Sequence, residues 1–282
     1  MSHLRRFFGA DTRTVSKDNQ ILPVTRWLSR ILVPALAVAS VILFGFPDQT
    51  TRLFAWTIRP DMTPLVMGAG YGVGAYFFYR VATLSNWHEV ALVFPGIAGF
   101  TWFMLFATLL HWENFNHSHV TFWIWTFLYV VAPFLVPAIW ILNNRTDPRI
   151  PAEKERVIPS IVRQISGASG LLITGTSVLL FFMPSILIAA WPWEVSPLTA
   201  RILLGWFVLF GIANLAVAYD SRWSAVRIVV QTQLIGFGLV LLGAVRAWSD
   251  FDPGNPLTWG FIGGFTIYLV VIGSLYYYFE TR

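Results

Sequence analysis

The segment VTFWIWTFLYVVAPFLVPAIWIL, residues 120–142, decides the fold, because none of its side chains is charged. As a helix it would rise about 35 Å, and the hydrocarbon layer of a bilayer is roughly 30 Å thick. Seven other apolar stretches, separated by short segments rich in Pro, Asp and Asn, have a comparable length. We predict an all-α protein with eight transmembrane helices near residues 28–46, 62–80, 90–110, 120–142, 167–190, 199–219, 228–246 and 257–279.

The composition agrees with a membrane environment. Of the 282 residues, 56% are hydrophobic and 12% are charged, and the mean hydropathy is +0.63. A soluble domain carries roughly a quarter charged residues, so the lipid bilayer is the expected partner. The sequence pI of about 9.7 comes from arginines that flank the spans, so we predict no nucleic-acid partner. The absence of cysteine excludes disulfides, thiolate metal sites and iron–sulfur clusters.

The distribution of basic residues predicts the orientation in the membrane. If the N-terminus is cytoplasmic, 15 of the 19 Lys and Arg residues fall on the cytoplasmic side, as the positive-inside rule requires. The basic N-terminal arm precedes the first apolar stretch, which ends without a small-residue cleavage site, so we expect the arm to be retained. We predict a multi-pass protein of the plasma (inner) membrane, with both termini cytoplasmic and residues 111–119 on the outer face.

The two halves of the chain resemble each other. SVILFGFP at residues 40–47 returns as SVLLFFMP at residues 177–184, and Trp87 and Trp123 match Trp223 and Trp259 further along. An even number of spans per copy keeps both copies in the same orientation, which predicts tandem four-helix repeats related by an axis along the membrane normal. We therefore predict an N-terminal arm at 1–27, a first repeat at 28–142, a basic cytoplasmic linker at 143–164 and a second repeat at 165–282.

The segment HWENFNHSH, residues 111–119, holds the candidate metal ligands. In an extended loop the imidazoles of His117 and His119 would lie on one side, and His111 with Glu113 would complete a set of zinc-like type. The alternative is a solvated loop whose histidines bind nothing. The four positions align with Ala247, Ser249, Pro253 and Asn255 in the second copy, so this cluster belongs to one half only.

Haem and a flat ligand on a glycine-rich helix face are two further candidate cofactors. A haem held by two histidines within the membrane is disfavoured, because His88 and His111 lie at opposite ends of one span, about 34 Å apart. A haem or chlorophyll-type pigment held by one histidine near the outer face stays an alternative. The glycines of GAGYGVGAY, residues 68–76, have the spacing that lets membrane helices pack closely, with a flat ligand on the glycine face as the minor option.

Ionisable residues are missing from the middle of the spans. Every Asp and Glu falls in a loop or at a span end, which argues against proton- or sodium-coupled transport. The deeper polar residues are neutral, and we expect Asn214, Gln231 and Gln233 to form hydrogen bonds between helices.

These observations predict a structural or accessory subunit of a larger membrane assembly, without chemistry of its own and in contact with other membrane subunits. A transporter or binding protein for a neutral or hydrophobic small molecule is the alternative. A membrane enzyme that uses the outer His/Glu cluster is a third reading.

The predicted orientation is open to a direct test. A reporter fused after Arg282 or inserted in residues 143–164 should be active only in the cytoplasm, whereas one inserted at Asn116 should report the outside. A cytoplasmic signal from the Asn116 insertion would contradict the predicted orientation of the whole chain.

Overall fold

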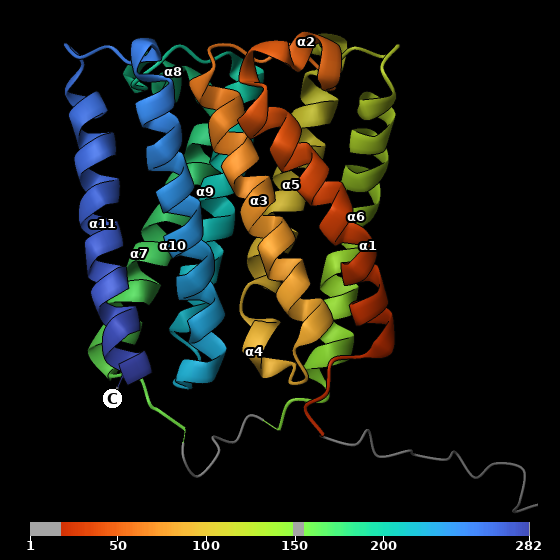
Figure 1. Ribbon diagram of the computed structural model, residues 1–282, viewed down its shortest axis with the longest axis vertical. Coiled ribbons are helices and arrows are strands. Elements are labelled where there is room, and N and C mark those ends of the chain that lie inside the picture. The colour runs from red at the N-terminus through yellow and green to blue at the C-terminus, as the bar shows by residue number, and fades with distance from the viewer. Residues whose placement is uncertain (1–17, 149–154, 282) are drawn as a thin grey trace, which may run out of the picture.

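The computed structural model describes residues 18–148 and 155–281, and this part of the chain is helical without strands. Residues 1–17 of the predicted arm and 149–154 of the predicted linker lie outside the described residues. The described chain begins and ends at the same end of a bundle of long helices (Figure 1). We call this end the α4 end and the opposite one the α2 end, after the short helices found there.

Long helices account for most of the described chain. They are α1 (Pro23–Ser40), α3 (Met62–Thr83), α5 (Phe94–Leu110), α6 (Val120–Asn144), α7 (Ser160–Phe182), α9 (Pro197–Val217), α10 (Trp223–Arg246) and α11 (Pro256–Thr281). The short ones are η1 (Val41–Gly45), η2 (Pro47–Gln49), α2 (Thr50–Leu53), α4 (His88–Ala91), η3 (Trp112–Asn114), α8 (Pro184–Ala190) and η4 (Trp248–Asp250).

Seven helical segments of the described residues are long and apolar enough to cross a membrane. They are Pro23–Gly45, His88–Leu110, Val120–Asn144, Ser160–Phe182, Pro197–Val217, Trp223–Arg246 and Pro256–Thr281. The chain thus has the character of a multi-pass membrane protein. Helix α3, with 22 residues, is as long as these but less apolar, because glycines and tyrosines interrupt its aliphatic residues. Eight spans therefore stay a prediction.

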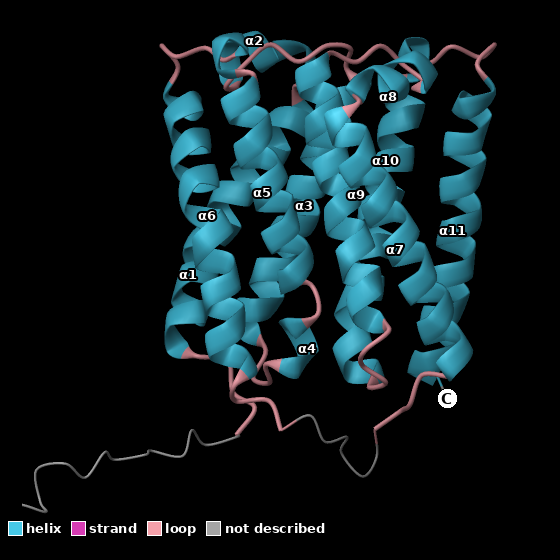
Figure 2. Ribbon diagram, turned by 180° about the vertical axis from the view of Figure 1, so that it is seen from behind, coloured by secondary structure: helices cyan, strands magenta, loops and turns pink. Residues whose placement is uncertain are grey.

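The fifth predicted span differs from the structure at both ends. Helix α7 begins at Ser160, before Arg163 and Gln164, whose polar side chains had placed the start at residue 167. It ends at Phe182, because Met183 (φ −125°, ψ 57°) leaves the helical region in front of Pro184. The α1–η1 segment ends in the same way, at Phe46 (φ −129°, ψ 58°) before Pro47. Figure 2 shows the short helices that follow these breaks lying across one end of the bundle.

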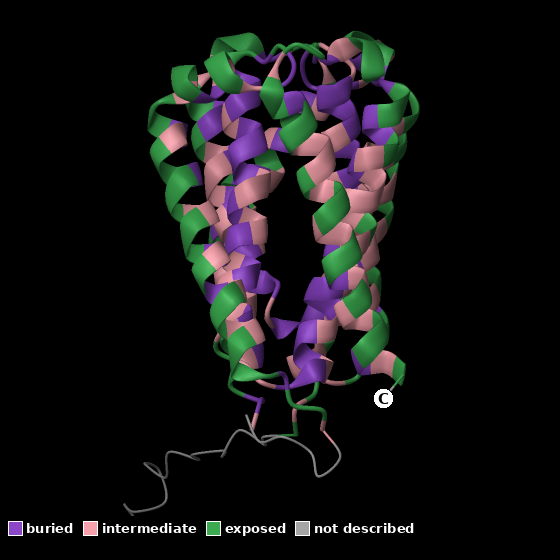
Figure 3. Cartoon of the chain, turned by 90° about the vertical axis from the view of Figure 1, so that its left-hand side faces the viewer, coloured by how far each residue is buried: buried purple, intermediate pink, exposed green. Residues whose placement is uncertain are grey.

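The long helices form two rows. Row one contains α1, α3, α10 and α11, and row two contains α6, α5, α9 and α7, each in the order of packing. Figure 3 shows the two rows edge-on, with exposed residues on their outer faces. Each row combines the first two long helices of one predicted repeat with the last two of the other. The packing therefore crosses the predicted domain boundaries, which themselves stay a prediction.

Glycines allow the closest helix contacts in row two. A Cβ atom on Gly170 of α7 would lie 2.5 Å from the carbonyl oxygen of Gly211 and from the nitrogen of Leu215, both on α9. A Cβ on Gly96 of α5 would lie 2.5 Å from the carbonyl oxygen of Leu209, also on α9. Because these neighbours are backbone atoms, which cannot rotate away, α9 can approach both α7 and α5 only where glycine is present.

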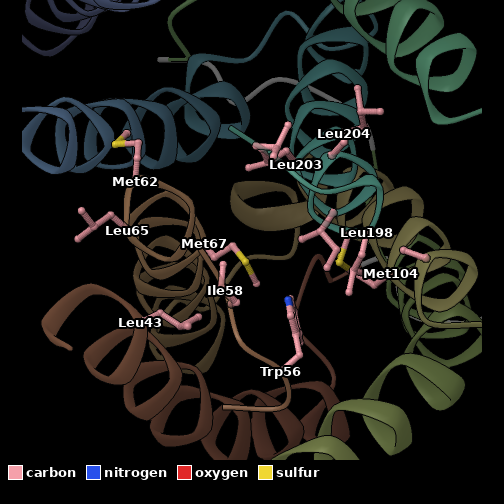
Figure 4. Packing of buried hydrophobic residues seen from close by; sticks show 14 of the residues in the cluster. Leu43, Trp56, Ile58, Met62, Leu65, Met67, Met104, Leu198, Leu203 and Leu204 are labelled. Atoms are coloured by element: carbon pink, nitrogen blue, oxygen red, sulfur yellow. The ribbon is translucent and has the colours of Figure 1, made fainter. Parts of the chain in front are cut away.

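Large apolar side chains fill the bundle near the α2 end. Figure 4 shows Leu43, Met67, Met104 and Leu203 among the packed side chains of this region. All four are buried and belong to one cluster that includes residues of both rows. Trp56, from the segment that follows α2, is buried in the same cluster.

Local geometry recurs between the two halves of the chain. The Trp56 and Phe115 rings have centroids 5.0 Å apart at 67°, and the Trp193 and Phe251 rings have centroids 5.2 Å apart at 67°. Isolated antiparallel bridges at the α4 end show the same correspondence, since they join Gln20 to Asn86 and Val157 to Arg222. The indole nitrogens of Trp123 and Trp259 each donate to the backbone oxygen six residues earlier, at 3.0 and 3.1 Å.

The glycine contact between α7 and α9 predicts a large effect of one substitution. Gly170→Leu should force the two helices apart and destabilise the protein by about 1–3 kcal/mol, seen as a lower Tm in detergent. Gly175→Leu on the same helix is the control, because a Cβ there meets no atom within 4 Å. Equal Tm values for the two variants would contradict this account of the packing.

Candidate functional site

The residues of the predicted metal cluster lie at the α2 end but make separate hydrogen bonds. His117 Nε2 donates to the backbone oxygen of Trp112 at 3.0 Å. His119 Nε2 lies 2.9 Å from the backbone oxygen of Arg52, to which it donates, and its Nδ1 accepts from the backbone nitrogen of Thr121 at 3.3 Å. His119 therefore acts as the N-cap of α6, with both ring nitrogens engaged.

His111 faces a different partner from the other histidines. Its Nε2 lies 2.7 Å from Nη1 of Arg201, which donates because guanidinium has no acceptor. Burial and the positive charge of Arg201 lower the pKa of His111 from its ordinary value near 6.5. The imidazole is thus held neutral.

No group of three or more His, Asp or Glu side chains within the described residues is placed to hold one metal ion. His111, Glu113, His117 and His119 therefore do not form a ready ligand set in this structure. A divalent metal at these residues stays a prediction, and it would require His119 to give up its hydrogen bonds. A connecting loop whose three histidines form hydrogen bonds within the protein accounts for the contacts that are observed.

Two arginines satisfy backbone carbonyls where helices end near the α2 end of the bundle. Arg201 of α9 donates through Nε to the carbonyl oxygen of Phe181 at 3.1 Å, near the end of α7. Arg246 of α10 donates to the carbonyl oxygens of Phe44 and Gly45, at the end of η1. The last carbonyls of a helix have no partner within it, so these arginines replace the missing donors.

A buried ion-pair network lies at the α4 end, and sequence reasoning missed it. Arg222 forms a two-pronged hydrogen bond with Asp147, at 2.9 and 3.0 Å, and pairs with Asp220 at 2.7 Å. Burial by itself would lower the pKa of Arg222, but the bonds and charges of the two carboxylates raise it above its ordinary value. The network joins the chain after α6 to the turn before α10.

The same end contains a second polar link between the halves of the chain. Glu155 accepts from the backbone nitrogen and the hydroxyl of Ser224, at 2.9 and 2.8 Å. His88 Nε2 lies 3.0 Å from the same hydroxyl, and its backbone nitrogen donates to the Asn19 side chain at 3.2 Å. These hydrogen bonds explain the position of the His88 side chain without invoking a cofactor.

The deep neutral polar residues form hydrogen bonds between helices, as expected. Gln233 of α10 donates to Asn214 of α9 at 3.3 Å and accepts from the hydroxyl of Tyr268 of α11 at 2.6 Å. Gln231 accepts from Tyr76 of α3 at 2.8 Å and donates to Tyr276 of α11 at 3.0 Å. These bonds link α10 to three other helices.

A cavity lies between the two rows of helices. Its volume is about 650 Å³, and it is lined by residues of α1, α3, α10 and α11 from row one and of α5, α6 and α9 from row two. Most of the lining is apolar or aromatic. The polar lining residues are Tyr71, Thr101, Thr121, Tyr129, Thr232 and Gln233. The residues that line this inter-row cavity were not predicted, because they depend on how helices distant in sequence are arranged.

The glycines of residues 68–76 pack against other helices, and two of them, Gly70 and Gly74, also line the cavity. A Cβ on Gly68 would lie 2.6 Å from the backbone nitrogen of Phe44, and one on Gly70 would lie 2.6 Å from the ring of Trp206. The first contact joins α3 to η1 within row one, and the second joins α3 to α9 across the rows. Close helix packing is therefore the use of these two glycines.

Comparisons of the chain with models of protein families, with curated proteins and with solved structures find no match.

The contact between His111 and Arg201 predicts a measurable titration. Arg201→Gln should raise the pKa of His111 toward 6.5, because the substitution removes the positive charge that opposes protonation. The measurement is a pH titration by NMR of protein with ¹³C-labelled histidine, with His111 assigned from a His111→Gln sample. Arg246→Gln is the control, since Arg246 contacts backbone carbonyls at the same end. An unchanged His111 titration in the Arg201 variant would contradict the assignment.

Proposed function

We propose that the chain crosses the plasma (inner) membrane eight times, with α3 as the eighth span and both termini cytoplasmic. The two halves are tandem repeats related by an axis along the membrane normal. The matched aromatic pairs, bridges and indole hydrogen bonds support this relation. The composition of the rows supports it as well, because exchanging α1 with α7, α3 with α9, α5 with α10 and α6 with α11 reproduces the same neighbours.

We further propose that the protein binds a neutral, hydrophobic small molecule between its two rows of helices. The inter-row cavity is the observation that carries this proposal. Its volume of about 650 Å³ is in the range of small-molecule sites, which are mostly apolar with a few polar groups that orient the ligand. The lining contains no charged residue, so a neutral ligand fits it better than an ion.

The surrounding bilayer is the proposed source of the ligand. Val38 of α1 and Ile124 of α6 both line the cavity, and their exposed fractions are 58% and 53%. The cavity thus extends to the outer surface of the bundle between α1 and α6, where lipid would surround the protein. A hydrophobic molecule could pass sideways through this opening without crossing water.

The exposed surfaces of the described helices do not distinguish an accessory subunit of a larger assembly from a protein surrounded by lipid. The exposed apolar side chains of α1, α6, α7 and α11 would suit a neighbouring subunit. Lipid tails suit the same surfaces, because apolar faces are the normal exterior of a membrane protein. Other membrane subunits as partners, and an enzyme based on the outer histidines, stay predictions.

Photolabelling tests ligand binding between the rows. In lipid nanodiscs the neutral photolabel 1-azidopyrene should attach to peptides of α6 and α9 that line the cavity. Ala132→Trp should reduce this labelling several-fold, because Ala132 lines the cavity and an indole would fill part of it. Labels are located by peptide mass spectrometry.

Val130→Trp provides the matched control for this experiment. Val130 lies on the same helix, is exposed and does not line the cavity, so labelling of the cavity peptides should be unchanged. Labelling confined to outward-facing residues, or an equal effect of both variants, would contradict binding between the rows.

A further inference from the structure

Two tyrosine hydroxyls meet across the inter-row cavity. Tyr71 of α3 belongs to row one and Tyr129 of α6 belongs to row two, and both line the cavity. Their hydroxyl oxygens are 3.0 Å apart, and both side chains are buried. This hydrogen bond joins the rows on the side where the cavity extends between α1 and α6.

Only one of the two hydroxyl protons takes part in the hydrogen bond between the tyrosines. One hydroxyl donates to the other, and the second proton has no acceptor among the described residues. The indole Nε1 of Trp206, which also lines the cavity, is buried without a partner. Its ring packs on that of Tyr71, with centroids 5.5 Å apart. The residues that line the cavity thus include two unused donors, and a buried donor without an acceptor costs about 1–3 kcal/mol.

The corresponding positions of the other half have no hydroxyl or indole group. When Ser40 is aligned with Ser177, Tyr71 corresponds to Val208. When Trp123 is aligned with Trp259, Tyr129 corresponds to Phe265. Trp206 corresponds to Ala69. The matched positions of the other half are apolar, so helix packing by itself does not require donors at these positions.

Aromatic rings form the walls around the donors. Trp125 and Tyr129 have ring centroids 4.5 Å apart, and Phe100 and Trp206 have centroids 4.3 Å apart. Rings of this kind favour stacked or edge-on contacts with another ring. A flat ring system therefore fits these walls better than a branched aliphatic molecule.

We propose that the inter-row cavity takes a flat, neutral, apolar molecule with a ring carbonyl, and that Tyr71 and Tyr129 donate the hydrogen bond that this oxygen accepts. The inference rests on the proposed binding of a hydrophobic molecule between the rows and specifies the chemistry of that molecule. The carbonyl supplies the acceptor that the tyrosine pair lacks.

A pair of probes that differ only in their carbonyls tests the inference. Binding of 2-methyl-1,4-naphthoquinone and of 2-methylnaphthalene is measured in nanodiscs by equilibrium dialysis, with empty nanodiscs subtracted. The chain has no cysteine, so the quinone has no thiol to react with. In the double variant Tyr71→Phe/Tyr129→Phe, quinone affinity should fall about fivefold, as expected for one lost hydrogen bond, while methylnaphthalene affinity is unchanged.

Single variants separate ligand binding from a structural role. Either Tyr71→Phe or Tyr129→Phe removes the bond between the rows, so a purely structural role predicts that each single variant behaves like the double one. Donation to the ligand predicts that at least one single variant keeps the affinity for the quinone, because one hydroxyl remains to donate. Tyr79→Phe on α3, at an exposed position outside the cavity, is the control and should leave both affinities unchanged.

The outcomes distinguish this inference from the proposed function. If the double variant binds the quinone as tightly as the parent protein, or loses both probes equally, the assignment of the tyrosine pair is overturned while binding between the rows stands. If neither probe binds above the level of empty nanodiscs, the proposed function fails and the inference fails with it.

Discussion

The structure depends on the satisfaction of backbone polar groups in a surrounding that offers no water. A helix satisfies its own backbone, which explains why the described chain runs almost entirely as long helices. Where α7 ends ahead of Pro184, the freed carbonyl of Phe181 receives a guanidinium from Arg201. Where η1 ends ahead of Pro47, Arg246 does the same. Breaks in the helices thus occur where a neighbouring helix supplies a donor.

Much of the helical pattern could be predicted from sequence, because each membrane helix is encoded by a continuous apolar stretch. Helices α5, α6, α9 and α11 begin and end within a few residues of the predicted spans. The errors at α7 have a common cause. A hydropathy pattern places a helix boundary at polar residues such as Arg163, although the helix includes them. The same pattern does not detect that the proline after Met183 ends the helix.

The candidate site was much less predictable, because its residues come together only through the order of helices in the rows. The composition of the histidine-rich loop suggested a metal site, yet its imidazoles form hydrogen bonds with backbone atoms and with an arginine. Tyr71 and Tyr129 are 58 positions apart, and although Tyr71 lies within the glycine segment 68–76, no sequence pattern connects it with Tyr129. One signal was present in the sequence: each of the two is aligned with an apolar residue in the other half. Comparison of two similar halves thus separates residues that the scaffold requires from those that are free to serve a site.

The composition of the rows has a consequence for biogenesis. Helices leave the ribosome in order, but α5 packs on α9 and α3 packs on α10, so these central helices acquire their long-term neighbours only after most of the chain has been made. Until then, Gly70 of α3 and Gly96 of α5 lack the α9 residues against which they pack. Within the first half only α1 with α3 and α5 with α6 have their final neighbours, so each row is completed only when helices of the second half have been made.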